Sequence, residues 1–274
     1  MKRVFVLGCH RSGTTLVQSL LAGHSAFTSF TESHFFSKGF YPLFLDGYRV
    51  RRRLPDLVDT FLDENGFTLE DAEPVPGRDF WASCGPYQAA KELLLLLDRC
   101  TMRRNASGWV EKTPSHVFRI PLLQEVTESP RFVHVIRRPE GVLPSLHKAS
   151  IEWGRMKTWT ECAVHWVWAL KVSEAYVGHP SHFLISYERL VQDPSSHMKR
   201  LIEWLGMDWE EDVLHNYRRE AVHLTTRQEV WKVSNLGGIS NKNRFSLSDL
   251  PLVARSIVQS FECYERLDRA LQAR

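Results

Sequence analysis

The chain has 274 residues, of which 43% are hydrophobic and 24% are charged, and its formal net charge is +3. This length allows one sizeable hydrophobic core or at most two small ones. The nearly balanced charge argues against nucleic acid as the main partner. Five scattered cysteines without CxxC spacing favour free thiols in a reducing compartment over a disulfide framework or a zinc site. They are Cys9, Cys84, Cys100, Cys162 and Cys263.

The apolar segments of the chain are short. The run at 4–8 follows Met-Lys-Arg directly and is too short for the core of a signal peptide. The runs at 93–97 and 163–170 are much shorter than the roughly 20 residues that span a bilayer. The sequence therefore predicts a cytoplasmic protein without a targeting or transmembrane segment.

Short runs rich in Val, Ile and Phe alternate with helical patterns along the chain. Such runs are typical of strands that are buried on both faces. The alternation predicts an α/β fold of the three-layer P-loop type, in which helices flank a mainly parallel sheet of about five strands. Helical patterns follow the first and fourth runs, and a longer one covers 161–176. The predicted strands are residues 3–8, 27–32, 108–112, 131–137 and 182–187.

The segment from about 37 to 107 interrupts this alternation. It is longer than a simple crossover and combines aromatic residues with the basic run RVRRR at 49–53. We expect a mainly helical insertion over the carboxyl edge of the sheet, where it would cap the acceptor side. The basic run is expected to be a solvated helix face, with an acceptor contact as the alternative. Because no repeat or linker divides the chain, a single domain covering 1–274 is predicted.

A glycine turn follows the first predicted strand. Gly8 and Gly13 stand in the frame Gly-x-x-x-x-Gly-Thr-Thr, which leads into a helix. Such a turn offers backbone N–H groups and a helix N-terminus to an anion, and Thr14 and Thr15 can add hydroxyl donors. The cation lies inside the turn at Arg11, whereas an NTPase P-loop has Lys at the position of Thr14.

The sequence offers no clear carboxylate for magnesium. The predicted strand 131–137 runs into two arginines, and Glu111 is followed directly by Lys112. A phosphate site that supplies its own cations favours sulfonyl transfer over phosphoryl transfer. The glycine turn alone is equally compatible with a purely structural connection between a strand and a helix, so the function depends on further motifs.

Three motifs, in the expected order and spacing, resemble those of the sulfotransferases that use PAPS (3′-phosphoadenosine 5′-phosphosulfate). The run RSGTT matches the family loop for the 5′-phosphosulfate. VIRRPEGVLPS matches a second motif, and the resemblance assigns Arg137 and Ser145 to the 3′-phosphate. YERLVQDP matches a third, which would place Tyr187 near the adenine. The loop residues are Arg11, Ser12, Gly13, Thr14 and Thr15.

Two further positions resemble a subgroup that includes protein-tyrosine sulfotransferases and bacterial relatives. TESHFF at 31–36 supplies Glu32, which that subgroup uses as the general base. EKTP at 111–114 supplies Lys112, which matches the family lysine that contacts the transferring group. Both positions follow predicted strands, so we expect both side chains at the carboxyl edge of the sheet, where α/β proteins bind ligands.

The chain departs from the family pattern in two places. Enzymes that act on phenols and steroids have a catalytic His directly after Lys-Thr, where this chain has Pro114. The nearest imidazole is His116, which is therefore an alternative to Glu32 as the base. The late Arg-Lys-Gly motif for the 3′-phosphate is absent, and Lys242 or Arg244 is the expected substitute.

The resemblance implies transfer of a sulfonyl group from PAPS to an acceptor hydroxyl, with PAP (3′-phosphoadenosine 5′-phosphate) as the product and no metal. Glu32 would take the hydroxyl proton while Arg11 and Lys112 stabilise the charge that develops. A tyrosine, a sugar or a small natural product are all open as acceptor, and so is the oligomeric state. The alternatives are a magnesium-dependent P-loop kinase and a non-catalytic PAP-binding module.

Overall fold

The structure is a computed structural model, and it describes residues 1–43, 47–224, 239 and 245–272. Within these ranges the central sheet has five parallel strands in the order β2-β5-β1-β6-β7. Each corresponds to a predicted strand, so the expected parallel sheet is confirmed. The strands are β1 (Lys2–Gly8), β2 (Phe27–Ser29), β5 (Gly108–Lys112), β6 (Arg131–Ile136) and β7 (His182–Ser186).

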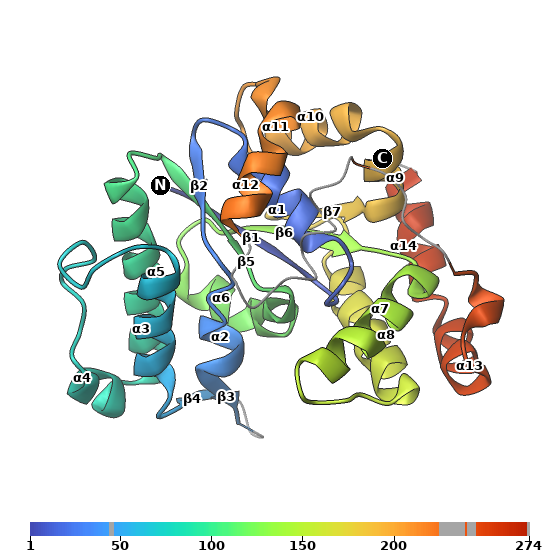
Figure 1. The fold of residues 1–274 in the computed structure, drawn as a ribbon, viewed down its shortest axis with the longest axis horizontal. Coiled ribbons are helices and arrows are strands. Elements are labelled where there is room, and N and C mark those ends of the chain that lie inside the picture. The colour runs from blue at the N-terminus through green and yellow to red at the C-terminus, as the bar shows by residue number, and fades with distance from the viewer. Residues whose placement is uncertain (44–46, 225–238, 240–244, 273–274) are drawn as a thin grey trace.

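Alternate residues of β1 face two separate hydrophobic cores, as expected for a strand that is buried on both faces. Val4 and Val6 belong to one core, and Phe5 and Leu7 belong to the other. Helices cover both cores, which gives the three predicted layers (Figure 1). The first layer contains α1 (Thr14–Ala22), α10 (Pro194–Trp204), α11 (Asp212–His215) and α12 (Tyr217–His223). The second contains α5 (Pro86–Arg103), α6 (Ile120–Val126), α7 (Pro139–Glu152), α8 (Trp159–Ala175), α13 (Leu252–Phe261) and α14 (Cys263–Gln272).

The carboxyl ends of the five strands meet at one edge of the sheet because the strands are parallel. Every segment that leaves this edge carries residues of the predicted site. The glycine turn follows β1, the Glu32 segment follows β2, and Lys112 is the last residue of β5. After β5 comes the 3₁₀ helix η1 (Pro114–Arg119), and after β7 comes α9 (Tyr187–Gln192). The fold therefore gathers these residues from distant parts of the sequence.

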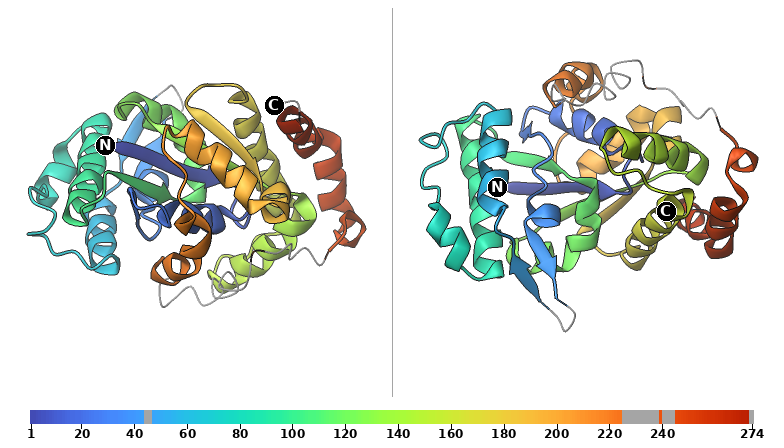
Figure 2. Two further views of the ribbon diagram at one scale, coloured as in Figure 1. Left: turned by 90° about the horizontal axis from the view of Figure 1, so that it is seen from above. Right: turned by 60° about the horizontal axis from the view of Figure 1, so that its bottom comes forward.

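The insertion at 37–107 is mainly helical, as expected, but it also contains a small antiparallel hairpin. Its last helix, α5, packs against β5 and α6 and so serves as a crossover helix beside the sheet. In Figures 1 and 2, α3, α4 and α5 lie together on one side of the molecule, and α13 and α14 lie on the opposite side. The insertion contains β3 (Phe40–Pro42), β4 (Tyr48–Val50), α3 (Leu54–Glu64) and α4 (Arg78–Ser83).

Two local expectations were wrong. The second strand ends at Ser29 and not at residue 32, so the segment that carries Glu32 leaves the sheet early. The basic run at 49–53 is not a helix face, because Arg49 lies in β4 and 51–53 form the approach to α3. Among the described helices, none is both long enough and apolar enough to cross a bilayer.

Candidate active site

The turn after β1 requires glycine at both of its ends. Gly8 has φ +149° and Gly13 has φ +96°, a range in which other residues are strained. A Cβ atom would lie 2.5 Å from the carbonyl oxygen of Val135 at the first position, and 2.3 Å from the ring of Tyr187 at the second. The turn is therefore pressed against both β6 and the start of α9.

Arg11 and Ser12 differ in their conformation and contacts inside this turn. Arg11 has φ +71°, a left-handed conformation that is uncommon for a side chain of this size and is often found at functional sites. Ser12 is buried, and its hydroxyl donates a hydrogen bond to the carbonyl oxygen of Cys9 at 2.6 Å. The hydroxyl hydrogen of Ser12 therefore closes the turn from within. Thr14 and Thr15 form the first turn of α1, directly beside it.

The side chains that were predicted to hold the phosphates meet beside this turn. Arg11 Nε donates to Ser145 Oγ at 2.9 Å, across 134 positions of sequence. Arg137 Nη1 donates to the carbonyl oxygen of Arg11 at 3.2 Å, and its guanidinium lies 3.9 Å from the centre of the Tyr187 ring. Burial lowers the pKa of Arg137, and the neighbouring Tyr187 and Glu188 oppose that shift. Two arginine side chains thus meet at the turn that leads into α1, which is an arrangement suited to anionic groups.

Glu32 and Lys112 form an ion pair at the same edge of the sheet. Lys112 Nζ donates to Glu32 Oε1, and only 1% of the lysine side chain and 15% of the glutamate side chain are exposed. His34 Nε2 lies 3.8 Å from the other carboxylate oxygen. The structure therefore brings together a carboxylate from the segment after β2 and an ammonium group from the end of β5.

His116 lies in a different environment from Glu32. Its side chain is fully buried, its Nδ1 lies 3.0 Å from Glu111 Oε2, and its ring packs edge-on against Phe36. Glu111 and Lys112 are consecutive residues of β5, so their side chains leave opposite faces of the strand. A fully enclosed imidazole cannot contact an acceptor in this conformation.

The sequence interpretation gave no role to two further imidazoles near the ion pair. Burial lowers the pKa of His10 to about 4 and that of His34 to about 4, while the charge of Glu32 opposes both shifts. The ring centre of His10 lies 5.6 Å from that of Trp153 and 5.7 Å from that of His165. Their positions in the sequence could have indicated this placement, because His10 precedes Arg11 and His34 follows Glu32 by two residues.

Some of the predicted residues cannot be placed with the rest. Lys242 and Arg244 lie outside the described residues.

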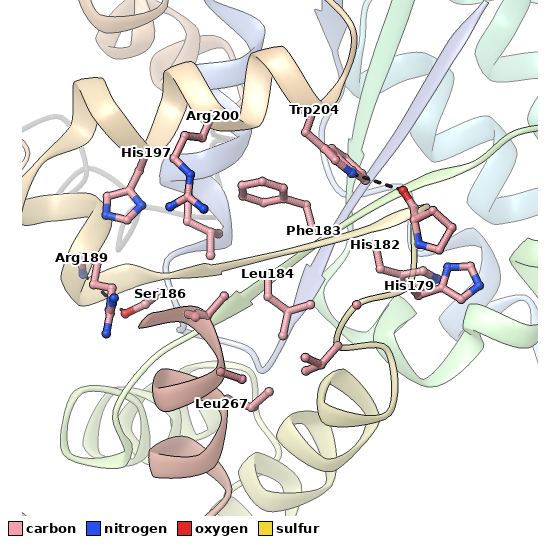
Figure 3. Close-up of a pocket in the computed structure, with 16 residues that line it drawn as sticks. His179, His182, Phe183, Leu184, Ser186, Arg189, His197, Arg200, Trp204 and Leu267 are labelled. Atoms are coloured by element: carbon pink, nitrogen blue, oxygen red, sulfur yellow. Dashed lines mark hydrogen bonds between the residues drawn. The ribbon is translucent and has the colours of Figure 1, made fainter. Parts of the chain in front are cut away.

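A pocket of about 260 Å³ lies between β7, α10 and α14, and Figure 3 shows β7 passing between these helices. None of its lining residues was predicted for the site. Within the described part of the chain, no group of three or more His, Cys, Asp or Glu side chains could hold a metal ion.

Comparison with known proteins defines the class of this chain. The model of the sulfotransferase family matches residues 3–211. The chain belongs to the sulfotransferase family, which confirms the resemblance found in its motifs.

Individual relatives are more distant. The omega-hydroxy-beta-dihydromenaquinone-9 sulfotransferase Stf3 of Mycobacterium bovis is 26% identical over 246 residues, covering 74% of this chain and 62% of the relative. The chain thus spans less than two thirds of that protein. The sulfotransferase domain of the Synechococcus PCC 7002 olefin synthase has a TM-score of 0.63 at 19% identity, with 95% of this chain and 94% of that one covered. Mouse SULT7A1 in complex with PAP has a TM-score of 0.53 at 12% identity, with 99% and 87% covered. At these identities the two structures show a shared fold.

Proposed function

We propose that this chain transfers the sulfonyl group of PAPS to a hydroxyl of an acceptor and releases PAP. One observation carries the proposal. Arg11, Ser145, Arg137 and Tyr187 come from three separate segments and contact one another beside the glycine turn. The family motifs assign Arg11 to the 5′-phosphosulfate, Arg137 and Ser145 to the 3′-phosphate, and Tyr187 to the adenine. Membership of the sulfotransferase family supports the same assignment.

The residues of the turn fit an anionic donor. The positive φ angles of Gly8, Arg11 and Gly13 bend the backbone sharply just before the N-terminus of α1. Arg11 would contact the 5′-phosphosulfate, together with the backbone N–H groups and hydroxyls of Thr14 and Thr15. Arg137 and Ser145 would hold the 3′-phosphate, and the ring of Tyr187 would lie near the adenine.

The ion pair of Glu32 and Lys112 supplies the groups for the transfer step. The acceptor oxygen forms a bond to sulfur, the bond from sulfur to the bridging oxygen breaks, and the acceptor proton passes to the carboxylate of Glu32. Lys112 and Arg11 stabilise the negative charge that develops on the sulfonyl group and the leaving phosphate. The buried position of His116 supports Glu32 as the base.

The acceptor that we favour is a small natural product rather than a tyrosine or a sugar. The name of the relative Stf3 supports this choice, because that protein acts on a hydroxylated menaquinone. We also propose a cytoplasmic location. All five cysteines are free thiols, and four of them are buried, which is typical of proteins in reducing compartments.

The decisive experiment combines ³⁵S-labelled PAPS with a panel of hydroxyl-bearing acceptors that includes quinols, prenyl alcohols, sugars and tyrosine peptides. Transfer of label, with equimolar release of PAP, is the expected result. Tight PAP binding without transfer to any acceptor would favour a non-catalytic PAP-binding module. Turnover of ATP in magnesium without transfer from PAPS would favour the kinase.

A further inference from the structure

The backbone of the sheet does not hold Glu32 beside Lys112. β2 pairs with β5 only from Phe27 to Ser29, opposite residues Gly108 to Val110. Glu32 lies three residues beyond the end of this ladder, and Lys112 lies two residues beyond it. Backbone pairing therefore leaves the distance between the two charged groups undetermined, and another set of contacts must fix it.

A buried carboxylate supplies these contacts. Glu111 Oε1 accepts hydrogen bonds from Ser33 Oγ at 2.8 Å and from Thr113 Oγ1 at 2.6 Å. Its other oxygen lies 3.0 Å from His116 Nδ1. The backbone N–H of His34 donates to Thr113 Oγ1 at 3.3 Å. Ser33 and His34 are the residues directly after Glu32, while Glu111 and Thr113 stand on either side of Lys112.

We propose that Glu111 is a positioning residue for the transfer step, which it serves through its hydrogen bonds to Ser33, Thr113 and His116. We call these four side chains the Glu111 clamp. Beyond the end of the ladder between β2 and β5, the hydrogen bonds of the clamp connect the Glu32 segment to the end of β5. This inference rests on the proposed function, because it assigns the clamp to the groups that would carry the reaction.

The electrostatics of Glu111 fit such a role. Burial alone would raise its pKa, but His116, Thr113 and Ser33 outweigh burial and hold the pKa below its ordinary value. The carboxylate is therefore ionised, and hydrogen bonds to an ionised acceptor are shorter and stronger than those between neutral groups. A buried charge that loses a partner is strongly disfavoured. The bonds to Ser33 and Thr113 are therefore held firmly.

His116 completes the clamp. Its Nδ1 faces Glu111, and its Nε2 is enclosed without a hydrogen-bond partner among the described residues. The ring packs against Phe36 at a distance of 5.2 Å between centres. Phe36 belongs to α2 (Phe35–Lys38), the helix that follows Glu32, so the imidazole contacts the start of that helix. The imidazole would thus affect the reaction through Glu111, without contacting the acceptor.

Thr113 offers a matched pair of variants that test the clamp. Thr113→Val keeps the shape of the side chain but removes the hydroxyl, whereas Thr113→Ser keeps the hydroxyl and removes a methyl group. We expect kcat for sulfonyl transfer to fall about 10-fold to 100-fold in Thr113→Val and less than about 3-fold in Thr113→Ser. KM for PAPS and the affinity for PAP should stay close to those of the wild type in both variants.

A second measurement does not need turnover. Acetic anhydride modification of Lys112, followed by mass spectrometry of the folded protein, reports how firmly the ammonium group is held. We expect modification to be several-fold faster in Thr113→Val than in the wild type, and Thr113→Ser to match the wild type. Equal modification rates in all three proteins would overturn the clamp. So would a Thr113→Val variant that loses PAP affinity by the same factor as kcat. Absence of transfer by the wild type would instead refute the proposed function, and the modification rates would still decide the role of the clamp.

Discussion

The proposed phosphate end and the proposed catalytic end of the site are held in place by different means. The glycine turn at 8–15 is shaped by backbone conformation, with positive φ angles at Gly8, Arg11 and Gly13. The pair of Glu32 and Lys112 stands beyond the last pairing between β2 and β5, and we propose that it depends on side-chain hydrogen bonds. We therefore expect the loss of side-chain hydrogen bonds to have its largest effect at the catalytic end. Substitutions that change backbone freedom, or that remove a cationic side chain, should act mainly at the phosphate end.

The largest effect is expected for Glu32→Gln. The amide keeps the size of the side chain but cannot take a proton, so turnover should fall by about 10²–10⁴-fold. PAP affinity, measured by calorimetry, should change little because Glu32 is assigned to the acceptor proton and not to either phosphate. His116→Asn is the comparison, and we expect a smaller loss from it since His116 acts through Glu111. If Glu32→Gln keeps most of its turnover while His116→Asn does not, the base is His116.

The next largest effect concerns the choice between PAP and AMP, which differ by the 3′-phosphate. Arg137→Ala removes a charged donor, so the preference for PAP should fall by roughly 10-fold to 100-fold. Arg138→Ala is a matched control, because the Arg138 guanidinium faces Tyr264 at 5.7 Å and not the turn. That variant should keep the preference. Equal affinities of the unmutated protein for PAP and AMP would contradict the assignment.

The fold, and the meeting of the residues that we propose for the phosphate end, could largely be predicted from the sequence. Apolar runs and the helices between them are enough to indicate a parallel sheet, and a parallel sheet brings all of its carboxyl ends to one edge. Arg137 and Tyr187 directly follow β6 and β7, and Arg11 lies three residues after β1, so their meeting is a consequence of the topology. Their motifs also have fixed spacing, since each one spans a single strand-to-helix connection.

The clamp could not be predicted in this way. Glu111 stands in an apolar strand, and the sequence interpretation assigned it no role because Lys112 follows it directly and argues against a magnesium ligand. Its proposed role depends on a hydrogen bond from Ser33, which lies 78 positions away and beyond the end of β2. Composition did not show where β2 would end, because FTSFTE has the character of a strand throughout. His116 was a candidate base for a similar reason, since burial is not visible in a short motif.

A smaller effect is expected for Gly13→Ala, which tests whether the phosphate end depends on the backbone conformation of the glycine turn. The new Cβ would lie 2.3 Å from the ring of Tyr187 at a φ of +96°, so turn and ring must separate. Strain of this kind costs about 1–3 kcal/mol, and PAP affinity should fall by about 10-fold. Gly66→Ala is the control, because Gly66 has φ +71° but no atom within 4 Å of the new Cβ. It should lower thermal stability and leave PAP affinity unchanged.

The smallest effect is expected from removal of divalent cations. The positive charges that would face the donor belong to Arg11, Arg137 and Lys112, and the N-terminus of α1 adds a favourable dipole. PAP affinity measured by calorimetry should therefore be the same in EDTA and in magnesium. Arg11→Ala serves as the positive control, since loss of its charged donor should weaken PAP binding by about 10-fold or more under both conditions. An absolute requirement for magnesium would mean that the cations of the protein do not suffice at the phosphate end, and it would return the magnesium-dependent kinase to consideration.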